Sequence, residues 1–546
     1  MHHGRPRCGA GAGTGQSPLT QALLPRYNLD QIVPPLGRQD LMRCSAASFF
    51  LVLFAITGQV LAAGGSLTLT VQDEATGEPT ITRTEISRAD SPGKRIPIRK
   101  SVSAGIGVVL DRELELSLAD AAYQFRMIRG PEYRIISGNF SLEKTSLDQH
   151  VVQLPRMVDM LQKGWTSGDC CVPSSPYSLP LRMASEDLHV AAVLGHVDAK
   201  PIPGRDRDDP PKNDPSWIRE DVRHYGGLLF FGSAAEQTET GESKLPVKRL
   251  VDAAASDEIR VAIENPFAWP LPVWLASEQI DGIFILGDWL RLDRKVSKVK
   301  EGRGPDGLGV GNDKAVGRWA ERIYWNMLEA GFRVPPLAGS GDEAGSTPVG
   351  YNRLYVADPL AEYEQAGNFE VRRVATAERW WRGAWLGQSV ATNGPMLRPQ
   401  LGGELPGHVF HASSGEVLQL QPELTLAVRD PVEYLEVIYN GKVHYSARLD
   451  EFAKAGGVIP PIMVKESGWV TMRVVTLYED HFRAAMSAPW YIEFDSKRRV
   501  TAESVEFFRK WLSEYEARLK RLPPEEMKRH VPYVRAARRF WANRAK

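Results

Sequence analysis

Three segments of the chain bring together residue types that could do metal chemistry. Residues 164–173 (GWTSGDCCVP) place Asp169 beside two cysteines, and residues 186–198 (EDLHVAAVLGHVD) carry His196 directly after an apolar run. Residues 349–356 (VGYNRLYV) hold an aromatic ring, an amide and a guanidinium group in succession. Carboxylate, imidazole and thiolate groups are the types that bind divalent metals. A metal held by them lowers the pKa of bound water and so supplies hydroxide for hydrolysis.

Apolar strands that alternate with helices would have to position these residues. Between residues 160 and 360, the strand-like runs Val190–Leu194, Gly226–Phe231 and Ile280–Leu286 alternate with helical stretches such as Ala315–Ala330. This alternation indicates a buried, parallel β/α core. In such folds functional groups gather at the carboxyl ends of the strands.

Two β-rich stretches and a helical tail flank this core. Ser66–Val71 alternates polar and apolar residues with period two, and short strands separated by turn residues follow it, which predicts a β-sandwich. Farther along, Tyr434–Tyr439 runs into Asn440-Gly441, a strong hairpin signal. In the tail, apolar residues at spacings of three and four predict an amphipathic helix. The predicted fold class is multidomain α/β plus β: a β-sandwich over 65–158, a β/α domain over 160–366, a β-rich completion of the core and C-terminal β domain over 367–500, and a helical tail over 501–546.

An export signal is the strongest local feature near the start of the chain. Arg43 precedes the apolar run Phe49–Ile56, and the small residues Ala62 and Ala63 follow where a signal peptidase would cut. The run is too short to span a bilayer, which needs about 20 apolar residues. The signal peptide is therefore predicted over residues 42–63, behind a disordered leader or an extension ahead of the true start, and the mature protein is expected to be secreted or periplasmic, without a membrane span.

Composition limits the classes of function. Lysine plus arginine equals aspartate plus glutamate, with 67 of each, so no general attraction to nucleic acid is expected. Of the four cysteines only the adjacent pair Cys170-Cys171 would remain after cleavage, and neighbouring cysteines bridge poorly, so no disulfide framework is expected. Many of the fourteen tryptophans lie between residues 265 and 385, which predicts a large aromatic core or an aromatic-lined groove.

Together the three segments resemble the PHP-type metallohydrolases, specifically the CehA/McbA-like group and its exported multidomain relatives. The resemblance spans about residues 65–545 and implies a distorted β/α barrel with ester or phosphoester hydrolase ancestry. It also implies a divalent metal, zinc or manganese. The ligands that it implies are Asp169, Cys171, His196, Glu264 and an acid at Glu220 or Asp221, with His224 close by. Tyr351, Asn352 and Arg353, followed later by the motif Thr392–Pro395, match the family and imply a substrate-binding role.

The chain departs from the family pattern at its most diagnostic positions. In the family a strand ends in Gly-Asp-x-His-x-His; here Gly168 and Asp169 match, but Cys171 and Pro173 replace the two histidines. Proline has no side-chain ligand, and Cys171 as a thiolate would favour zinc. The late Asp-x-His signature, at best Gly341-Asp342-Glu343, lacks its histidine.

Each candidate also has a structural interpretation. Asp169 would then hydrogen-bond the turn around it, Cys171 would be a small buried hydrophobe, and Arg353 would pin a loop through its guanidinium fork. Two functions follow: an exported metal-dependent hydrolase, or a non-catalytic relative that kept the scaffold and binds a small-molecule or carbohydrate ligand through its β-domains or its tryptophan-rich segment. The lost histidines favour an altered or lost metal site.

Overall fold

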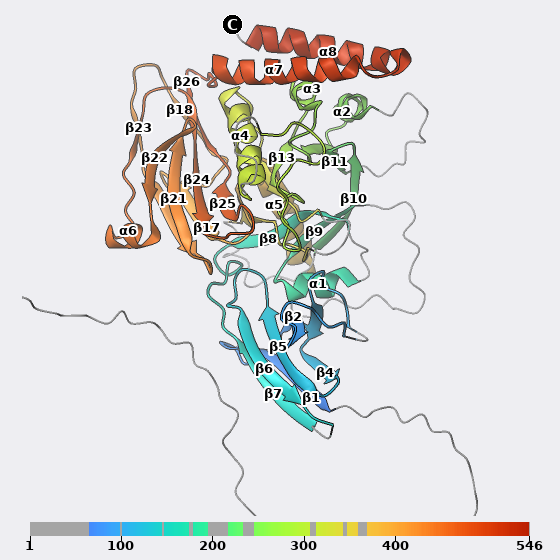
Figure 1. Cartoon of the computed structure of the whole chain (residues 1–546). Helices are drawn as coiled ribbons and strands as arrows, with labels where there is room; N and C mark the ends of the chain where they lie inside the picture. The colour runs from blue at the N-terminus through green and yellow to red at the C-terminus, as the bar shows by residue number, and fades with distance from the viewer. Residues whose placement is uncertain are drawn as a thin grey trace, which may run out of the picture. The chain divides into compact units, whose positions relative to one another are not determined.

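The computed structural model describes residues 65–98, 101–144, 147–173, 178–194, 217–232, 245–305, 313–341, 347–358 and 369–544 (Figure 1). All of them belong to one unit, Ala62–Lys546. The predicted leader and signal peptide lie outside the described residues, and so does the predicted ligand His196. The described part combines strands and helices in a mixed α/β plus β class, as the sequence predicted.

A seven-stranded sheet forms the N-terminal part of the described chain. Its strand β1 (Ser66–Asp73) alternates as predicted, with Leu67, Leu69 and Val71 buried and the residues between them partly exposed. All seven strands send apolar side chains into one core. The strand order is β6 (Ile136–Leu142), β5 (Ala121–Ile128), β2 (Ile81–Arg88), β3 (Val108–Asp111), β4 (Glu113–Ser117), β1 and β7 (Leu147–Leu154).

A second, larger sheet forms the α/β core. Its first half runs in the order β14 (Pro336–Ala338), β13 (Gly282–Leu286), β12 (Arg260–Ile263), β11 (Leu228–Phe231), β10 (Trp217–Tyr225), β9 (Val190–Leu194), β8 (Trp165–Val172) and β15 (Arg353–Ala357). The strands β8, β9 and β10 are parallel, and so are β12, β13 and β14.

The prediction of a parallel core is wrong at β11 and at β15, each of which is antiparallel to both of its neighbours. At β11 the cause is local. Gly226 and Gly227, with φ of 57° and 92°, make a tight turn between β10 and β11. Only antiparallel strands can be joined by so short a connection, because a parallel crossover needs a dozen or more residues.

The same sheet continues into the C-terminal β region. Beyond β15 come β16 (Ser389–Thr392), β25 (Ala484–Ser487), β24 (Gly468–Thr476), β21 (Val432–Tyr439) and β22 (Lys442–Ala447), with β26 (Trp490–Phe494) paired to β24 and to β18 (Val409–Ala412). Two small ladders join β17 (Met396–Leu401) to β20 (Pro422–Ala427) and β19 (Leu418–Leu420) to β23 (Ile462–Val464). The hairpin predicted at Asn440-Gly441 is confirmed, and both residues have positive φ.

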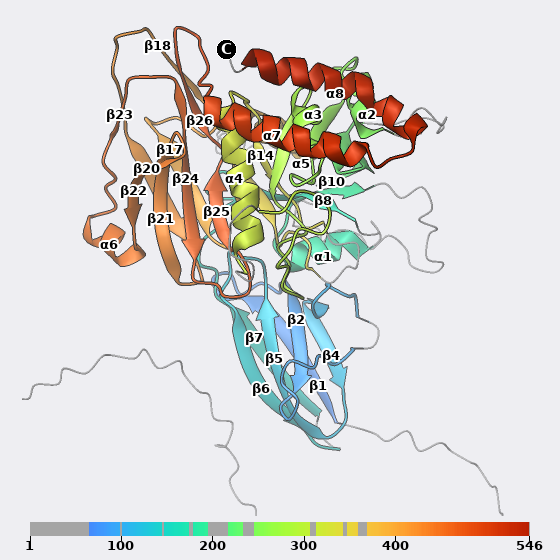
Figure 2. The same ribbon diagram turned by 45° about the horizontal axis from the view of Figure 1, so that its top comes forward.

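The helices of the described chain are α1 (Leu179–Ser185), α2 (Pro246–Ala253), α3 (Leu271–Leu275), α4 (Ala315–Glu329), α5 (Phe369–Leu386), α6 (Leu449–Lys454), α7 (Ala502–Leu519) and α8 (Pro524–Arg544). The last two form the tail: α7 contacts α3 and α4, and α8 contacts α3. Figure 2 shows α7 and α8 side by side and next to α3. Trp541 of α8 is fully buried and donates its indole N–H to the carbonyl of Pro272 at 2.9 Å.

The tryptophan-rich segment forms core and not a groove. Trp274, Trp319 and Trp380 are at most 1% exposed and belong to one hydrophobic cluster with α7 and α8. No helix among the described residues is long and apolar enough to cross a membrane.

Candidate functional site

Asp169 lies on β8, whose eight residues are all buried, and its carboxylate is occupied by main-chain donors. One oxygen accepts from the amides of Cys171 and Ser340, both at 3.0 Å, and the other accepts from the amide of Gly350 at 2.8 Å. Burial raises the pKa of Asp169, while the hydrogen bonds from Ser340, Cys171 and Gly350 oppose the rise. The carboxylate thus ties β8 to the loop after β14 and to the turn before β15, which is the structural interpretation considered above.

Cys171 is next to Asp169 and lies in an environment that keeps its thiol protonated. Burial raises the pKa of Cys171 well above its usual value, and the charges of Glu264, Asp169 and Asp288 raise it further. Metal ligation requires the thiolate. Both Cys170 and Cys171 are free and buried.

Of the other predicted ligands, Glu264 lies near enough to Cys171 for its charge to raise the pKa of the thiol. Glu220, Asp221 and His224 were expected ahead of a strand, but they lie within β10, where Glu220 and His224 are exposed. Asp221 pairs with Arg219, and Glu264 lies 3.6 Å from His224 between Oε2 and Nε2. Among the described residues no three His, Cys, Asp or Glu side chains gather as a metal site. The described part of the predicted ligand set does not form a metal site by itself, and metal binding that includes His196 stays a prediction.

In the Tyr351-Asn352-Arg353 motif, the side chains of Asn352 and Arg353 donate hydrogen bonds to main-chain carbonyls. Arg353 donates to the carbonyls of Gly350 at 2.5 Å and Glu186 at 3.0 Å, and is 1% exposed. Asn352 is fully buried and donates to the carbonyls of residues 287 and 290. Tyr351 and Arg353 also line a cavity.

This cavity, of about 340 Å³, lies where the three sequence regions of the described chain meet. That volume falls within the range of small-molecule sites, roughly 300–1,000 Å³. Its wall is polar and rich in arginine on several sides. The side chains that matter below are Arg83, Glu85 and Ile128 from the N-terminal sheet, Glu186, Leu292 and Tyr351 from the α/β core, and Asn393, Arg429, Asp430, Tyr478 and Arg483 from the C-terminal β region.

Two arginines on the C-terminal wall stand in different surroundings. Arg483 pairs with Asp430 at 3.0 Å between Nη1 and Oδ2, and its guanidinium lies 4.5 Å from the ring centre of Tyr478. Arg429 donates Nη1 to the carbonyls of Gly130 at 2.9 Å and Tyr133 at 3.2 Å. Burial and the charge of Arg483 together lower the pKa of Arg429 to about 10, against the opposing charges of Asp430 and Glu186. Both arginines still carry a positive charge at neutral pH.

Tyr351 is held by a buried histidine. Its hydroxyl lies 2.7 Å from Nε2 of His481, and Nδ1 of His481 lies 3.1 Å from the carbonyl oxygen of Phe482. Burial lowers the pKa of His481 to about 4, so the ring is neutral at physiological pH. The carbonyl requires the proton on Nδ1, which leaves Nε2 as the acceptor of the Tyr351 hydroxyl proton. The hydroxyl oxygen can then accept a hydrogen bond from a ligand.

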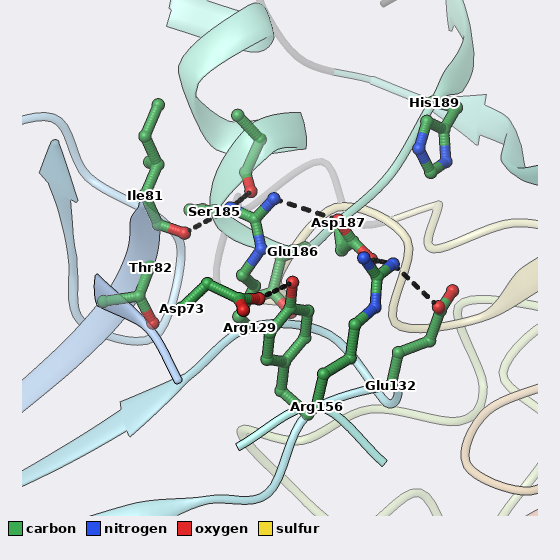
Figure 3. A network of polar contacts seen from close by, with 12 residues as sticks. Asp73, Ile81, Thr82, Arg129, Glu132, Arg156, Ser185, Glu186, Asp187 and His189 are labelled. Carbon is green, nitrogen blue, oxygen red and sulfur yellow. Dashed lines mark hydrogen bonds and ion pairs between the residues drawn. The ribbon is translucent and has the colours of Figure 1, made fainter. Parts of the chain in front are cut away.

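A network of charges beside the cavity joins the N-terminal sheet to the α/β core (Figure 3). Asp187, in the turn between α1 and β9, pairs with Arg129 at 3.0 Å and with Arg156 at 2.8 Å. Arg156 also pairs with Glu132 at 3.0 Å, and the other oxygen of Glu132 accepts from the Tyr355 hydroxyl. Both carboxyl groups are buried, so the pairs are shielded from solvent.

Sequence reasoning missed Arg429, Arg483 and His481. Each lies in a connection that precedes a strand: Arg429 before β21, and the other two before β25. The only local signal was a group of aromatic and charged residues (Tyr478 to Arg483) between two strand patterns, a place where binding residues often lie.

Comparisons with known proteins do not assign the chain to a family. No family model and no curated protein matches it. Among solved structures, the Bacillus anthracis TIE protein shares 17% identity over 20% of this chain and 19% of its own, with a TM-score of 0.14. A Parabacteroides merdae β-glucuronidase shares 7% identity over 76% of this chain and 61% of its own, with a TM-score of 0.15, and its glycerol complex shares 9% over 76% and 60%. The chain thus spans less than two thirds of each, and scores this low do not indicate a common fold.

Proposed function

We propose that the chain is an exported, PHP-like protein that binds a small-molecule or carbohydrate ligand, and whose ancestral metal site is altered or lost. The proposed scaffold is a β-sandwich followed by a distorted β/α barrel of the CehA/McbA type. The cavity of about 340 Å³ carries this proposal, because it is large enough for a small ligand and is lined by all three regions of the chain. The predicted export signal supports a location outside the cytoplasm, secreted or periplasmic.

The surroundings of Asp169 support the loss of metal chemistry. A catalytic metal needs carboxylate lone pairs that are free to bind it, whereas both oxygens of Asp169 accept main-chain hydrogen bonds. Burial opposes ionisation of the Cys171 thiol, and Pro173 has no side-chain ligand, so neither position offers the imidazole that the family motif would supply.

A retained hydrolase is the second candidate. The carboxylates of Glu264, Asp288 and Asp169 all act on the Cys171 thiol, so acidic groups do surround this strand end. A metal brought there with His196 would act as a Lewis acid and lower the pKa of bound water. In that case the same residues would carry phosphoesterase activity.

Elemental analysis separates the two candidates. The full chain, purified after growth with added zinc and manganese, is expected to hold no stoichiometric metal and to cleave no phosphomonoester or phosphodiester. A His196→Ala variant is the matched test, because it removes the predicted ligand. One bound metal per chain, lost in His196→Ala together with an esterase activity, would overturn the binding function and establish the hydrolase.

A further inference from the structure

The cavity carries an excess of positive charge. Of the described residues that line it, six are arginines and four are acidic. The acids are partly used within the wall: Glu85 and Glu186 both pair with Arg83, and Asp430 pairs with Arg483. A cavity wall with unbalanced charge in a partly desolvated site favours a ligand of opposite sign.

Arg429 is a lining arginine without an acidic partner in an ion pair among the described residues. Within the described residues its guanidinium bonds only main-chain carbonyls, and no carboxylate lies within ion-pair distance of it. Carbonyl dipoles orient the group but do not neutralise it. A second cation, Arg483, lies close enough to act on its pKa. Asp430 and Glu186 act on the pKa of Arg429 in the opposite sense, but each is paired with another arginine, so Arg429 presents its positive charge to the cavity.

The motif Thr392–Pro395 positions the side chain of Arg483. Asn393 accepts from Arg483 Nε through its carbonyl at 2.8 Å, and its side chain binds the main chain of Phe482 and Ala484. Gly394 leaves room for the arginine, because a Cβ at this position would lie 3.0 Å from Nε. The guanidinium is thus fixed before any ligand arrives, and a fixed donor loses less entropy on binding.

The rest of the wall fits an organic body attached to the anion. Ile128 and Leu292 present apolar surface, and the rings of Tyr351 and Tyr478 lie on the same wall as Arg483. The Tyr351 hydroxyl, held by His481, and the Asn393 segment offer hydrogen-bonding groups beside the arginines.

We propose that this cavity binds a small organic oxyanion, a carboxylate or a phosphate ester, whose charged group is held between Arg429 and Arg483. The inference rests on the proposed binding function and names the chemical class of its ligand. A guanidinium presents two parallel N–H donors that match the oxygens of either group.

Calorimetric titration of the full chain at low ionic strength tests the inference. The probes are inorganic phosphate, galacturonate, galactose 6-phosphate and, as the uncharged match, galactose. At least one of the oxyanions is expected to bind, and galactose is expected to bind much more weakly. Added salt should weaken the binding, because it screens the charges. A preference for galacturonate assigns a carboxylate ligand, and a preference for galactose 6-phosphate assigns a phosphate ester.

Two arginine variants make the test specific. Arg429→Gln should weaken oxyanion binding by about 10- to 100-fold, since it removes a charge-assisted hydrogen bond. Arg535→Gln, which removes an exposed positive charge on α8, should leave the affinity unchanged. Arg429→Lys keeps the positive charge but loses the paired N–H donors of the guanidinium, so its oxyanion affinity should lie between those of Arg429→Gln and Arg535→Gln. Arg483 is less suitable for substitution, because it also holds Asn393 and Asp430. Circular dichroism and thermal unfolding show whether each variant is folded.

The outcomes separate this inference from the function on which it rests. Binding of galactose with no oxyanion binding would overturn the inference and leave the binding function standing. Equal oxyanion affinity in the folded wild-type chain and Arg429→Gln would also overturn it, and so would the absence of any oxyanion binding. Oxyanion binding that depends on Arg429, in a chain that proves to hold a catalytic metal, would support the inference and overturn only the non-catalytic function.

Discussion

The substitution Glu132→Gln should change how the stability of the chain depends on pH. Glu132 is fully buried; it accepts from the Met160 amide at 2.8 Å, from Arg156 at 3.0 Å and from the Tyr355 hydroxyl at 3.0 Å. Burial raises the pKa of Glu132 from its usual 4.5 to about 7, and the negative charge of Asp187 adds to the rise, whereas Arg156 opposes it. The folded chain therefore retains a proton that the unfolded chain has already released.

The sign and the size of the effect follow from this difference. Between pH 4.5 and pH 7 the folded state binds more protons than the unfolded state, so the free energy of unfolding falls as the pH rises through this window. A pKa difference of this size corresponds to about 3 kcal/mol, at roughly 1.4 kcal/mol per unit. Burial and the charges of Arg129 and Arg156 act in opposite directions on the pKa of Asp187, and the charges win, lowering it to about 2. The stability that ionised Asp187 contributes is lost only as the pH falls toward 2, which is below the window from pH 4.5 to pH 7.

Glutamine has no proton to lose, so Glu132→Gln should be insensitive to pH over this range. The N–H₂ group of the glutamine would face one of the groups that donate to Glu132 in the wild type. This contact between two donors lowers the free energy of unfolding by about 1–3 kcal/mol at every pH. This constant cost cancels when the difference between variant and wild type is compared across pH. Relative to the wild type, the free energy of unfolding of the variant should therefore rise by about 3 kcal/mol between pH 4.5 and pH 8.

Urea unfolding followed by tryptophan fluorescence, at several pH values from 4.5 to 8, measures this difference. Glu115→Gln, at an exposed position of β4 in the same N-terminal sheet, is the matched control and should follow the wild type at every pH. A Glu132→Gln chain that differs from the wild type by the same free energy at pH 4.5 and pH 8 would refute the reasoning. The carboxyl group would then be ionised in the folded chain throughout the window.

Three further outcomes are expected. Asp169→Asn should destabilise the fold by about 1–3 kcal/mol in urea unfolding, because an amide N–H₂ would face one of the main-chain donors; unchanged stability would contradict the structural role of this carboxylate. Trp541→Ala should cost about 3–5 kcal/mol by leaving a cavity between α8 and α3, whereas Val531→Ala, on the exposed side of α8, should cost far less. In a secreting host, Edman sequencing of the exported protein should begin close to residue 63, and an exported chain that retains Phe49–Ile56 would contradict the predicted signal.

Local pattern was enough to predict many of the elements. The strand Val190–Leu194 has the predicted bounds, and the hairpin at Asn440-Gly441 lies where the turn signal placed it. In the tail, Phe508, Trp511, Leu512, Tyr515 and Leu519 are all buried, as their spacing predicted. In each case the information lies within a few residues, because side-chain periodicity and turn preference are local properties.

The direction of β11 was decided by a short local turn that the strand and helix pattern did not reveal, and the role of the aromatic residues was decided by contacts between distant segments. The alternation of strands and helices predicted a parallel core, but the short Gly226-Gly227 turn made β11 antiparallel. The tryptophans could have lined a core or a groove, and packing under α7 and α8 made them core. A period in the sequence shows which face of an element is apolar but does not show what will cover that face.

At the candidate site, the difference between what the sequence determined and what the tertiary structure decided is clearest. The sequence alone determined the residue types near Asp169 and the absence of the family histidines, because a motif is a property of consecutive residues. Only the tertiary structure decided that Asp169 binds three amides, two of them from Ser340 and Gly350 far along the chain. The cavity likewise exists only because three regions meet and bring Arg429 and Arg483 to one wall. Charge excess in a cavity depends on distances between residues that no local pattern relates, so only the folded chain decides it.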